Sequence, residues 1–160
     1  PGLPIYASRD LQNWRHVSNV VYSEEQIPEY DKTVGMQRGI YAPTLRHHDG
    51  TFYVIVTFMP LSEEEPFHLI FNTTDPKVPE SWSIEPVRWI NEDIGSFDPD
   101  LFWDDDGQAY VTCHVFDIVG DNIYPIDVTT GKYGPNTNLW NGTGGVWPEG
   151  PHMYRKDDYY

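Results

Sequence analysis

Residues 98–110 read DPDLFWDDDGQAY, and the same pattern of residues occurs at two other places in the chain. The copies are residues 42–53 (APTLRHHDGTFY) and residues 150–160 (GPHMYRKDDYY). Each copy has a proline, a large apolar residue two positions later, a polar turn that contains Asp, and then aromatic residues. An Asp-Gly pair between two extended segments is typical of a β-hairpin. We therefore predict that each copy folds as a strand, a tight turn and a second strand.

A second pattern falls between these copies. Residues 5–10 (IYASRD) lead to Trp14, and residues 70–75 (IFNTTD) lead to Trp82. Each reads as a strand, a polar turn with Asp, and a tryptophan that can pack on a neighbouring sheet. Further strands are predicted where β-branched and aromatic residues gather, at residues 51–58 (TFYVIVTF), 108–116 (QAYVTCHVF) and 122–128 (NIYPIDV).

The spacing of the repeats indicates the fold class. The prolines at positions 43, 99 and 151 lie 56 and 52 residues apart. Hairpins that recur every ~50 residues without crossover helices match the four-stranded blades of a β-propeller. A β-sandwich would account for the strands but not for the repeat. Because a propeller needs at least about four blades to close, we expect residues 1–160 to be one all-β domain that is incomplete at both ends. Such a domain covers roughly three blades.

Composition and charge exclude several classes of function. The chain has 160 residues, with 10 Lys+Arg against 25 Asp+Glu and a formal net charge of −15. It therefore lacks the basic face that binds nucleic acid or an anionic membrane surface. Its 6 Trp, 11 Tyr and 7 Phe are too many large apolar side chains for a disordered acidic tail. Because Cys113 is the one cysteine, we expect neither an internal disulfide nor a thiolate metal site.

Two carboxylates stand just before the repeated prolines. Asp98 precedes Pro99, and Glu149 lies two residues before Pro151. In a propeller the inner strands surround a central channel, so equivalent positions of successive blades converge there. Paired carboxylates beside aromatic residues suit glycosidic cleavage, in which one carboxyl protonates the leaving oxygen and another activates water. The alternative is structural, with both carboxylates accepting hydrogen bonds from backbone N–H groups at the blade junctions.

Four segments together resemble glycoside hydrolase family 43, whose β-xylosidases and α-L-arabinofuranosidases have a five-bladed propeller. The order and spacing of the four segments make the resemblance specific along nearly the whole chain. It implies a glycosidase that hydrolyses xylan- or arabinan-derived oligosaccharides with inversion at the anomeric carbon. A β-xylosidase is the first choice and an α-L-arabinofuranosidase the second. The segments are residues 1–14 (PGLPIYASRDLQNW), 39–50 (GIYAPTLRHHDG), 97–107 (FDPDLFWDDDG) and 149–156 (EGPHMYRK).

The resemblance also implies roles for individual residues. Glu149 lies where the family has its general acid. Asp98 lies where the family has a carboxylate that raises the pKa of that acid and orients it. Phe97 would flank the sugar, and Tyr41, where many members have tryptophan, would be a stacking platform or pack between blades. His152 would line the channel or support Glu149.

One part of the family pattern has no match in this chain. The family's general base is an aspartate near the start of the first blade, and no segment here resembles its surroundings. Asp10 belongs to the turn of an outer hairpin and Asp31 to a polar loop, so we assign neither of them this role. With the base absent and sheet edges open, we expect the 160-residue chain alone to be inactive and poorly folded.

Three further expectations concern cofactors, location and an alternative function. His47 and His48 are adjacent and would point to opposite faces of a strand, so we predict no metal site and no cofactor in this chain, although complete family members can hold Ca²⁺ in the channel. The sequons at Asn72 and Asn141 and the tryptophan-rich, acidic composition favour an extracellular location over a cytoplasmic one. The alternative to an enzyme is a non-catalytic propeller module that binds carbohydrate or protein.

Overall fold

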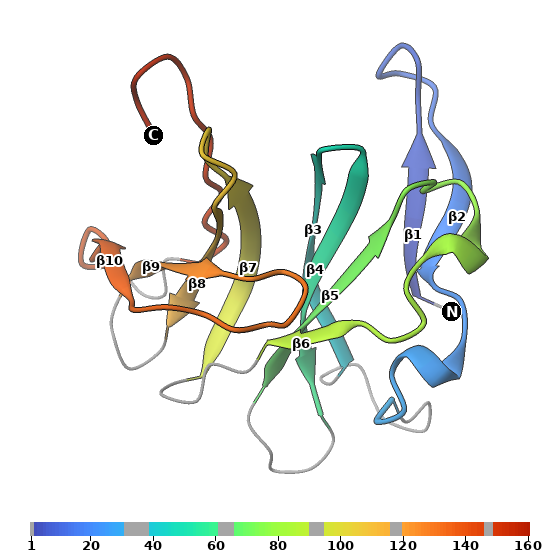
Figure 1. Cartoon of the computed structure of the whole chain (residues 1–160), viewed down its shortest axis with the longest axis horizontal. Helices are drawn as coiled ribbons and strands as arrows, with labels where there is room; N and C mark the ends of the chain where they lie inside the picture. Colours follow the sequence, from blue (N-terminus) through green and yellow to red (C-terminus); the bar gives the residue numbers. More distant parts are fainter. Residues whose placement is uncertain (1, 31–38, 61–65, 90–94, 116–119, 146–148) are drawn as a thin grey trace.

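A computed structural model of the protein describes residues 2–30, 39–60, 66–89, 95–115, 120–145 and 149–160. Within these ranges the chain forms strands and two short 3-10 turns (Figure 1). No helix in these ranges is long and apolar enough to cross a membrane. The elements in chain order are β1 (Gly2–Ala7), β2 (Arg15–Val21), η1 (Glu24–Gln26), β3 (Gly39–His48), β4 (Thr51–Met59), β5 (Phe67–Thr73), η2 (Pro79–Ser81), β6 (Val87–Trp89), β7 (Ser96–Trp103), β8 (Ala109–Val115), β9 (Asp121–Ile126) and β10 (Thr137–Trp140).

The strands form three antiparallel sheets that follow the order of the chain. β1 and β2 make a two-stranded sheet; β3 to β6 make a four-stranded sheet, here the β3 sheet; and β7 to β10 make another, the β7 sheet. In each four-stranded sheet every strand pairs with the next one along the chain. Figure 1 shows the sheets standing beside one another, and β3 contacts β7. The all-β class is therefore confirmed, and the row of four-stranded meanders is the arrangement that propeller blades have.

The hydrophobic cores lie between the sheets. On one face of β4, Val54 and Val56 pack in the core that contains Trp82 and reaches the β1–β2 hairpin. On the other face, Ile55 packs with Leu101 and its neighbours in the β7 sheet. Successive side chains of a strand point to opposite faces, so a strand that is covered on both faces is apolar at consecutive positions. The continuous apolar run of β4 therefore marks the middle layer of the molecule.

The repeated prolines mark one backbone feature. Ala42 and Asp98 each precede a repeated proline, and each lies in a β-bulge of the first strand of its sheet. The bulges occupy the same register, because Tyr41 pairs with Thr57 before one bulge and Phe97 pairs with His114 before the other. The hairpin repeat predicted from the sequence is confirmed for β3–β4 and β7–β8, but it is wrong for residues 150–160, which form only an isolated bridge between Lys156 and Tyr159. Backbone φ is positive at the residue before four prolines, Leu3 (60°), Ala42 (45°), Asp98 (54°) and Gly150 (71°).

The individual strand predictions are confirmed with small shifts of their ends. Residues 51–58 fall on β4. The strand predicted at 108–116 is β8, and its last residue lies outside the described residues. The strand predicted at 122–128 is β9, which ends at Ile126 because Asp127 starts a turn. The carboxylate of Asp127 accepts hydrogen bonds from the Thr129 amide at 2.8 Å and the Thr129 hydroxyl at 2.6 Å.

The two tryptophans of the second pattern differ in environment. Trp82 is 1% exposed and lies in the core beside the β1–β2 hairpin. Trp14 is 55% exposed. Its indole N–H donates to the Leu11 carbonyl at 3.1 Å, which holds the ring against its own turn. The prediction that each tryptophan packs on a neighbouring sheet is therefore right for Trp82 and wrong for Trp14.

Candidate active site

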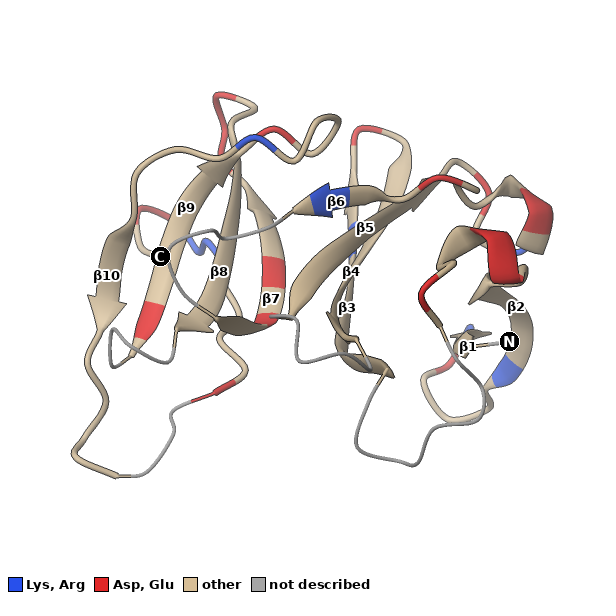
Figure 2. Cartoon of the chain, turned by 90° about the horizontal axis from the view of Figure 1, so that it is seen from below, with Lys and Arg blue, Asp and Glu red and all other residues tan. Residues whose placement is uncertain are grey.

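Asp98 stands on β7, at the bulge that faces the β3 sheet. Figure 2 shows acidic residues within the ribbon of β7, and these are Asp98 and Asp100. The Asp98 side chain is half-buried, and its backbone amide donates to Thr57 Oγ1 on β4 at 3.2 Å. A left-handed φ at a residue with a Cβ costs roughly 1–2 kcal/mol, although aspartate tolerates it better than most residues. The neighbouring sheet thus holds Asp98 in a conformation that the chain would not otherwise prefer.

Three buried polar side chains connect β4 and β5 to the start of β7, next to this bulge. Thr57 Oγ1 lies 3.3 Å from His68 Nδ1, and His68 Nε2 lies 2.8 Å from Ser96 Oγ at the start of β7. Thr57, His68 and Ser96 are all buried. Desolvation lowers the pKa of His68 to about 3, so this ring is neutral near pH 7. The β3 sheet therefore positions the start of β7 with neutral groups that add no charge beside Asp98.

Asp100 lies two residues further along β7 and is completely buried, with 0% exposure. Arg46 of β3 binds it with a two-pronged contact, in which Nε donates to Oδ1 at 2.8 Å and Nη2 contacts Oδ2. The backbone amide of Met153 donates to Oδ2 at 3.2 Å. The hydrogen bonds between Arg46 and Asp100 raise the pKa of Arg46, so the guanidinium stays charged. One carboxylate thus joins β3, β7 and residues 149–153.

Glu149 is exposed at the beginning of that last segment. Gly150 follows it with a left-handed φ of 71°, and the Pro151 carbonyl accepts from the Thr112 hydroxyl of β8 at 3.4 Å. Residues 151 and 153 are therefore both attached to the β7 sheet. Glu149 projects from a segment that is fixed on its C-terminal side.

His152 and the two aromatic candidates occupy positions around these carboxylates. His152 is 47% exposed, and its Nδ1 lies 3.4 Å from Asp100 Oδ2. Tyr41 and Phe97 are half-buried and hold matching positions just before the two bulges. The structure therefore brings His152 to a carboxylate, although to Asp100 and not to Glu149.

Asp98 lies on β7, and Glu149 lies in the segment that follows β10. Within the described ranges, no hydrogen bond or ion pair joins the two carboxylates. Their roles as acid and modulator remain predictions.

Metal ligands do not gather anywhere in the described ranges, where no group of three or more His, Cys, Asp or Glu side chains could hold an ion. His47 and His48 diverge as the strand geometry predicts. The His47 ring contacts Phe52 with centroids 4.6 Å apart, and the His48 ring stacks on Trp103 at 4.8 Å. Their surroundings are aromatic, so both histidines have packing roles.

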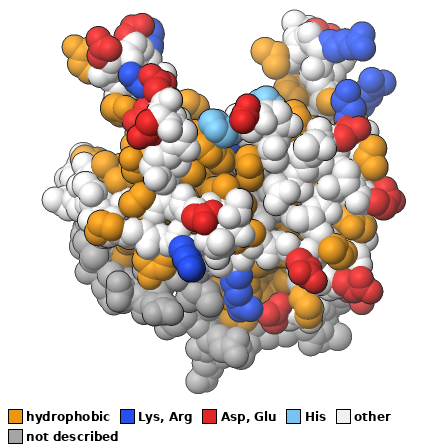
Figure 3. All heavy atoms as spheres, viewed as in Figure 1, with side chains coloured by type: hydrophobic (Ala, Val, Ile, Leu, Met, Phe, Trp, Pro, Cys, Tyr) orange, Lys and Arg blue, Asp and Glu red, His pale blue; other side chains and the backbone are white. Residues whose placement is uncertain are grey.

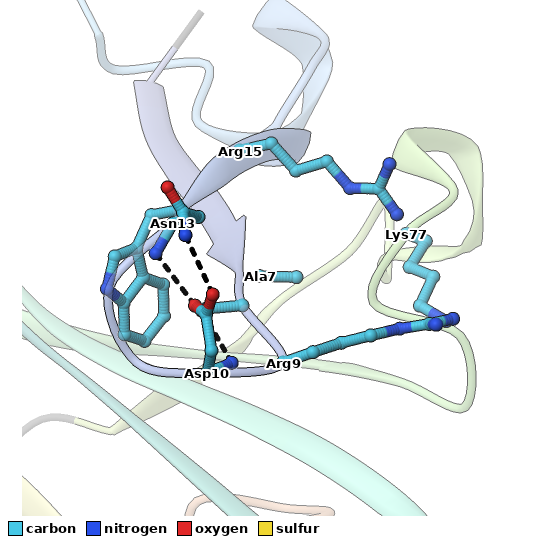
Figure 4. Close-up of a pocket in the computed structure, with 8 residues that line it drawn as sticks. Ala7, Arg9, Asp10, Asn13, Arg15 and Lys77 are labelled. Carbon is cyan, nitrogen blue, oxygen red and sulfur yellow. Dashed lines mark hydrogen bonds between the residues drawn. The ribbon is translucent and has the colours of Figure 1, made fainter.

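A hollow of about 610 Å³ lies elsewhere, at the turn between β1 and β2. Arg9, Arg15 and Lys77 line it (Figure 4), and Figure 3 shows Lys and Arg side chains on this upper-right projection. Asp10 also lines the hollow, but its carboxylate accepts hydrogen bonds from Ser8, Gln12 and Asn13. These bonds, chiefly those with Asn13, lower the pKa of Asp10. A carboxylate held in this way in an outer hairpin is a turn residue, as predicted.

Sequence reasoning missed Asp100 and its partner Arg46 as site residues. A signal for Asp100 was present, because Thr44, Asp100 and His152 each directly follow a repeated proline. Polar residues at one repeated position of an inner strand indicate a shared contact between blades. No comparable signal marks Arg46, whose equivalent on β7 is Phe102.

Successive four-stranded antiparallel sheets, whose first strands share a bulge that carries a carboxylate in β7, define part of a β-propeller with a candidate carboxylate site. The comparisons with known proteins name the family. A model of the glycosyl hydrolases family 43 matches residues 1–160, and the chain belongs to this family.

Relatives of known name cover the whole chain. A xylosidase/arabinosidase of Butyrivibrio fibrisolvens is 36% identical over 171 residues, which span 100% of this chain and 31% of that protein. A non-reducing end α-L-arabinofuranosidase of Bacteroides ovatus is 35% identical over 100% of this chain and 28% of its own length. The chain thus spans about a third of the length of these relatives.

A solved structure agrees with the fold. The xylan β-1,4-xylosidase from Bacillus halodurans C-125 matches with a TM-score of 0.83 and 32% identity. The match covers 98% of this chain and 31% of that one. The predicted partial propeller is therefore confirmed.

Proposed function

We propose that the full-length gene product carrying this sequence is a glycosidase that hydrolyses xylo- or arabino-oligosaccharides with inversion. The observation that carries the proposal is Asp98, a carboxylate in a left-handed bulge of an inner strand. The equivalent bulge of β3 is formed with Ala42, so the bulge does not require a carboxylate, and Asp98 supplies one where paired carboxylates would act on a glycoside. The named relatives, xylosidases and arabinofuranosidases, support the same reaction.

Glu149 is the proposed general acid. Its carboxyl proton passes to the glycosidic oxygen as the bond from that oxygen to the anomeric carbon breaks. Water attacks the same carbon from the opposite face and forms the new C–O bond, and a general base takes the water proton. We assign that base to no residue of this chain, so we also propose that the 160 residues alone do not turn over substrate.

Asp98 is the proposed modulator of Glu149. A negative charge near a second carboxyl favours the protonated form of that carboxyl, which is the form a general acid needs. Tyr41 and Phe97, at matching positions before the bulges, are the proposed aromatic walls for the sugar. We propose a β-D-xyloside as the first substrate and an α-L-arabinofuranoside as the second.

The test is hydrolysis of nitrophenyl β-D-xylopyranoside and nitrophenyl α-L-arabinofuranoside by the full-length gene product. We expect turnover of at least one, and Glu149→Ala should lower kcat for oligosaccharides by about 10²–10⁴-fold. Glu85→Ala, at another exposed glutamate, is the control and should leave kcat unchanged. Failure of the folded protein to hydrolyse either compound, or any oligosaccharide, would favour a carbohydrate-binding propeller.

A further inference from the structure

The buried carboxylate of Asp100 is the best-connected side chain near the candidate acid. We propose that Asp100 is a positioning residue that fixes Glu149 through the backbone of Met153, an inference that rests on the proposed function. Asp100 does not reach the sugar in this role. It acts by holding the segment from which Glu149 projects.

The contacts divide between the two carboxylate oxygens. Oδ1 accepts from Arg46 Nε at 2.8 Å, and Oδ2 contacts Arg46 Nη2. Oδ2 also accepts from the Met153 amide at 3.2 Å and lies 3.4 Å from His152 Nδ1. A carboxylate has about four acceptor positions, so these contacts leave little of it unsatisfied. Oδ1 thus binds Arg46, and Oδ2 contacts both Arg46 and the segment that carries Glu149.

Because Asp100 is completely buried, its carboxylate needs well-placed partners. An ionised carboxylate out of water is strongly unfavourable unless it is paired and hydrogen-bonded. The fork of an arginine fits a carboxylate with a fixed geometry, and Arg46 reaches Asp100 from the neighbouring sheet. The direction of the Asp100 side chain is therefore set by β3. The Met153 amide then takes its position from a group that is already fixed.

The segment between Glu149 and Met153 transmits that position over four residues. Pro151 has a restricted φ, and its carbonyl accepts from Thr112 at 3.4 Å. Met153 is held by Asp100. Two attachments two residues apart leave the preceding backbone few alternatives. When the hydrogen bond from Met153 to Asp100 is lost, the hydrogen bond from Thr112 to Pro151 remains. The segment is then held less firmly, and the carboxyl of Glu149 moves relative to the scissile oxygen.

The matching residue of the β3 sheet shows what is unusual in Asp100. Thr44 occupies this position on β3, and its hydroxyl donates to the Pro99 carbonyl of the next sheet at 3.1 Å. Both residues therefore connect one repeat of the chain to the next. Thr44 does so with one neutral hydrogen bond, whereas Asp100 uses a charged group with several contacts. The stronger connection is the one that leads to the candidate acid.

The experiment compares Asp100→Asn with the unchanged full-length gene product on two substrates. Xylobiose needs a proton on its leaving oxygen, whereas dinitrophenyl β-xyloside has a leaving group that needs little protonation. If Glu149 is displaced, kcat on xylobiose falls about 10–100-fold, with KM changed less than about threefold. On the dinitrophenyl substrate kcat falls much less. A merely structural loss would lower both rates equally.

A double variant separates position from stability. Asp100→Leu with Arg46→Met removes both charges, and replacing a buried ion pair by apolar groups is often neutral for stability. We expect this protein to fold and to keep the low kcat on xylobiose, because the Met153 amide has lost its acceptor. Recovery of kcat together with stability would overturn the proposal. Glu29→Gln, which removes the Arg88–Glu29 ion pair at 2.9 Å, is the control and should change neither rate.

Hydrogen exchange distinguishes this proposal from the function on which it rests. The Met153 amide should exchange at least about tenfold faster in Asp100→Asn than in the unchanged protein, since its acceptor is altered. If the unchanged protein cleaves no glycoside, the proposed function fails, and exchange still reports the anchoring of Met153. Unchanged exchange at Met153, or kcat on xylobiose within twofold in an active protein, contradicts the proposal for Asp100.

Discussion

β3 and β7 make the same bulge at the same register, but they carry different side chains on it. Ala42 and Asp98 both precede a proline and have φ values of 45° and 54°. One presents a methyl group and the other a carboxylate. Because the strained backbone is present in both sheets, the strain belongs to the way each sheet begins. The chemistry belongs to the side chain that occupies that position in one sheet.

The two sheets also differ in the residue pairs beside the bulge. Thr57 pairs with His68 in the β3 sheet, and His114 pairs with Asp121 at the same place in the β7 sheet. The neutral pair supports the start of the next sheet through the Asp98 amide. The other pair combines two titratable groups. Equivalent positions thus carry Thr57 and His68 in one sheet and His114 and Asp121 in the next.

The largest expected effect comes from making the β7 bulge resemble the β3 bulge. Asp98→Ala in the full-length gene product should lower kcat about 10²–10⁴-fold, which corresponds to roughly 3–5 kcal/mol in the barrier. Steady-state kinetics on xylobiose measure this loss, with circular dichroism to show that the sheets persist. The matched control Ala42→Asp should leave kcat within about twofold. Equal losses in both variants would mean that the bulge, and not its carboxylate, limits the reaction.

A second effect concerns pH. Burial lowers the pKa of His68 to about 3 from 6.5. Between these two pH values His68 is protonated in the unfolded chain and neutral in the folded chain. The free energy of unfolding should therefore fall, as pH is lowered from 6.5 toward 3, by up to about 1.4 kcal/mol per pH unit. Urea unfolding of the unchanged protein and of His68→Gln between pH 7 and 4 measures the difference.

Asp121 at the matching position should act in the opposite direction. Desolvation raises its pKa above 3.8, against a smaller lowering by His114. The folded state then holds its proton more tightly than the unfolded state, so this residue lowers stability as pH rises above 3.8. Asp121→Asn should remove that loss in the same urea series. If the free energy of unfolding varies with pH in the same way in His68→Gln and Asp121→Asn, the two residues do not have opposite effects on the pH dependence of stability.

A smaller effect is expected at Thr44. Thr44→Val removes its hydrogen bond to the Pro99 carbonyl and keeps the shape of the side chain. The free energy of unfolding should fall by about 1 kcal/mol, which the midpoint of urea unfolding reports. A loss as large as that of Asp100→Ala, expected at about 3–5 kcal/mol for a broken buried pair, would remove the distinction between the two connections.

The smallest effect comes from relieving the strain itself. Ala42→Gly allows the left-handed φ without a Cβ and should stabilise the protein by up to about 1 kcal/mol. Thermal unfolding measures it. Leu11→Gly, at another residue with positive φ whose side chain is 78% exposed, is the companion variant and should shift stability the same way. Destabilisation by both glycines would show that the side chains contribute more through packing than they cost in strain.

Much of this architecture could be predicted from local sequence. The Pro-x-Leu and Asp-Gly pattern identified the β3–β4 and β7–β8 hairpins, since turn chemistry acts between residues that are close along the chain. The short strand β6 has three residues, and β10 has four exposed ones. β6 alternates over only three residues and β10 has no buried face, so neither gives the longer alternation that marks a strand, and both escaped prediction.

The site was predicted less completely for a related reason. Asp98 and Glu149 stood out because they lie beside repeated prolines. Arg46 and Asp100 are 54 residues apart, and their pairing depends on how two sheets stand against each other. Trp14 differs from Trp82 for the same reason, because a tryptophan is buried only where a second sheet covers it. Local sequence does not contain that information.

The hydrogen bonds that join one inner strand to the next also bear on how the chain folds. Those made by Thr44, Arg46 and Met153 span 55, 54 and 53 residues. Closing loops of this length costs conformational entropy before the contacts between their ends can stabilise the chain. Proteins dominated by such distant contacts fold in milliseconds to seconds. Each sheet is local in sequence and can form first. We therefore expect the contacts of Asp100 with Arg46 and Met153 to be among the last to form, so that the segment that carries Glu149 docks at the end of folding.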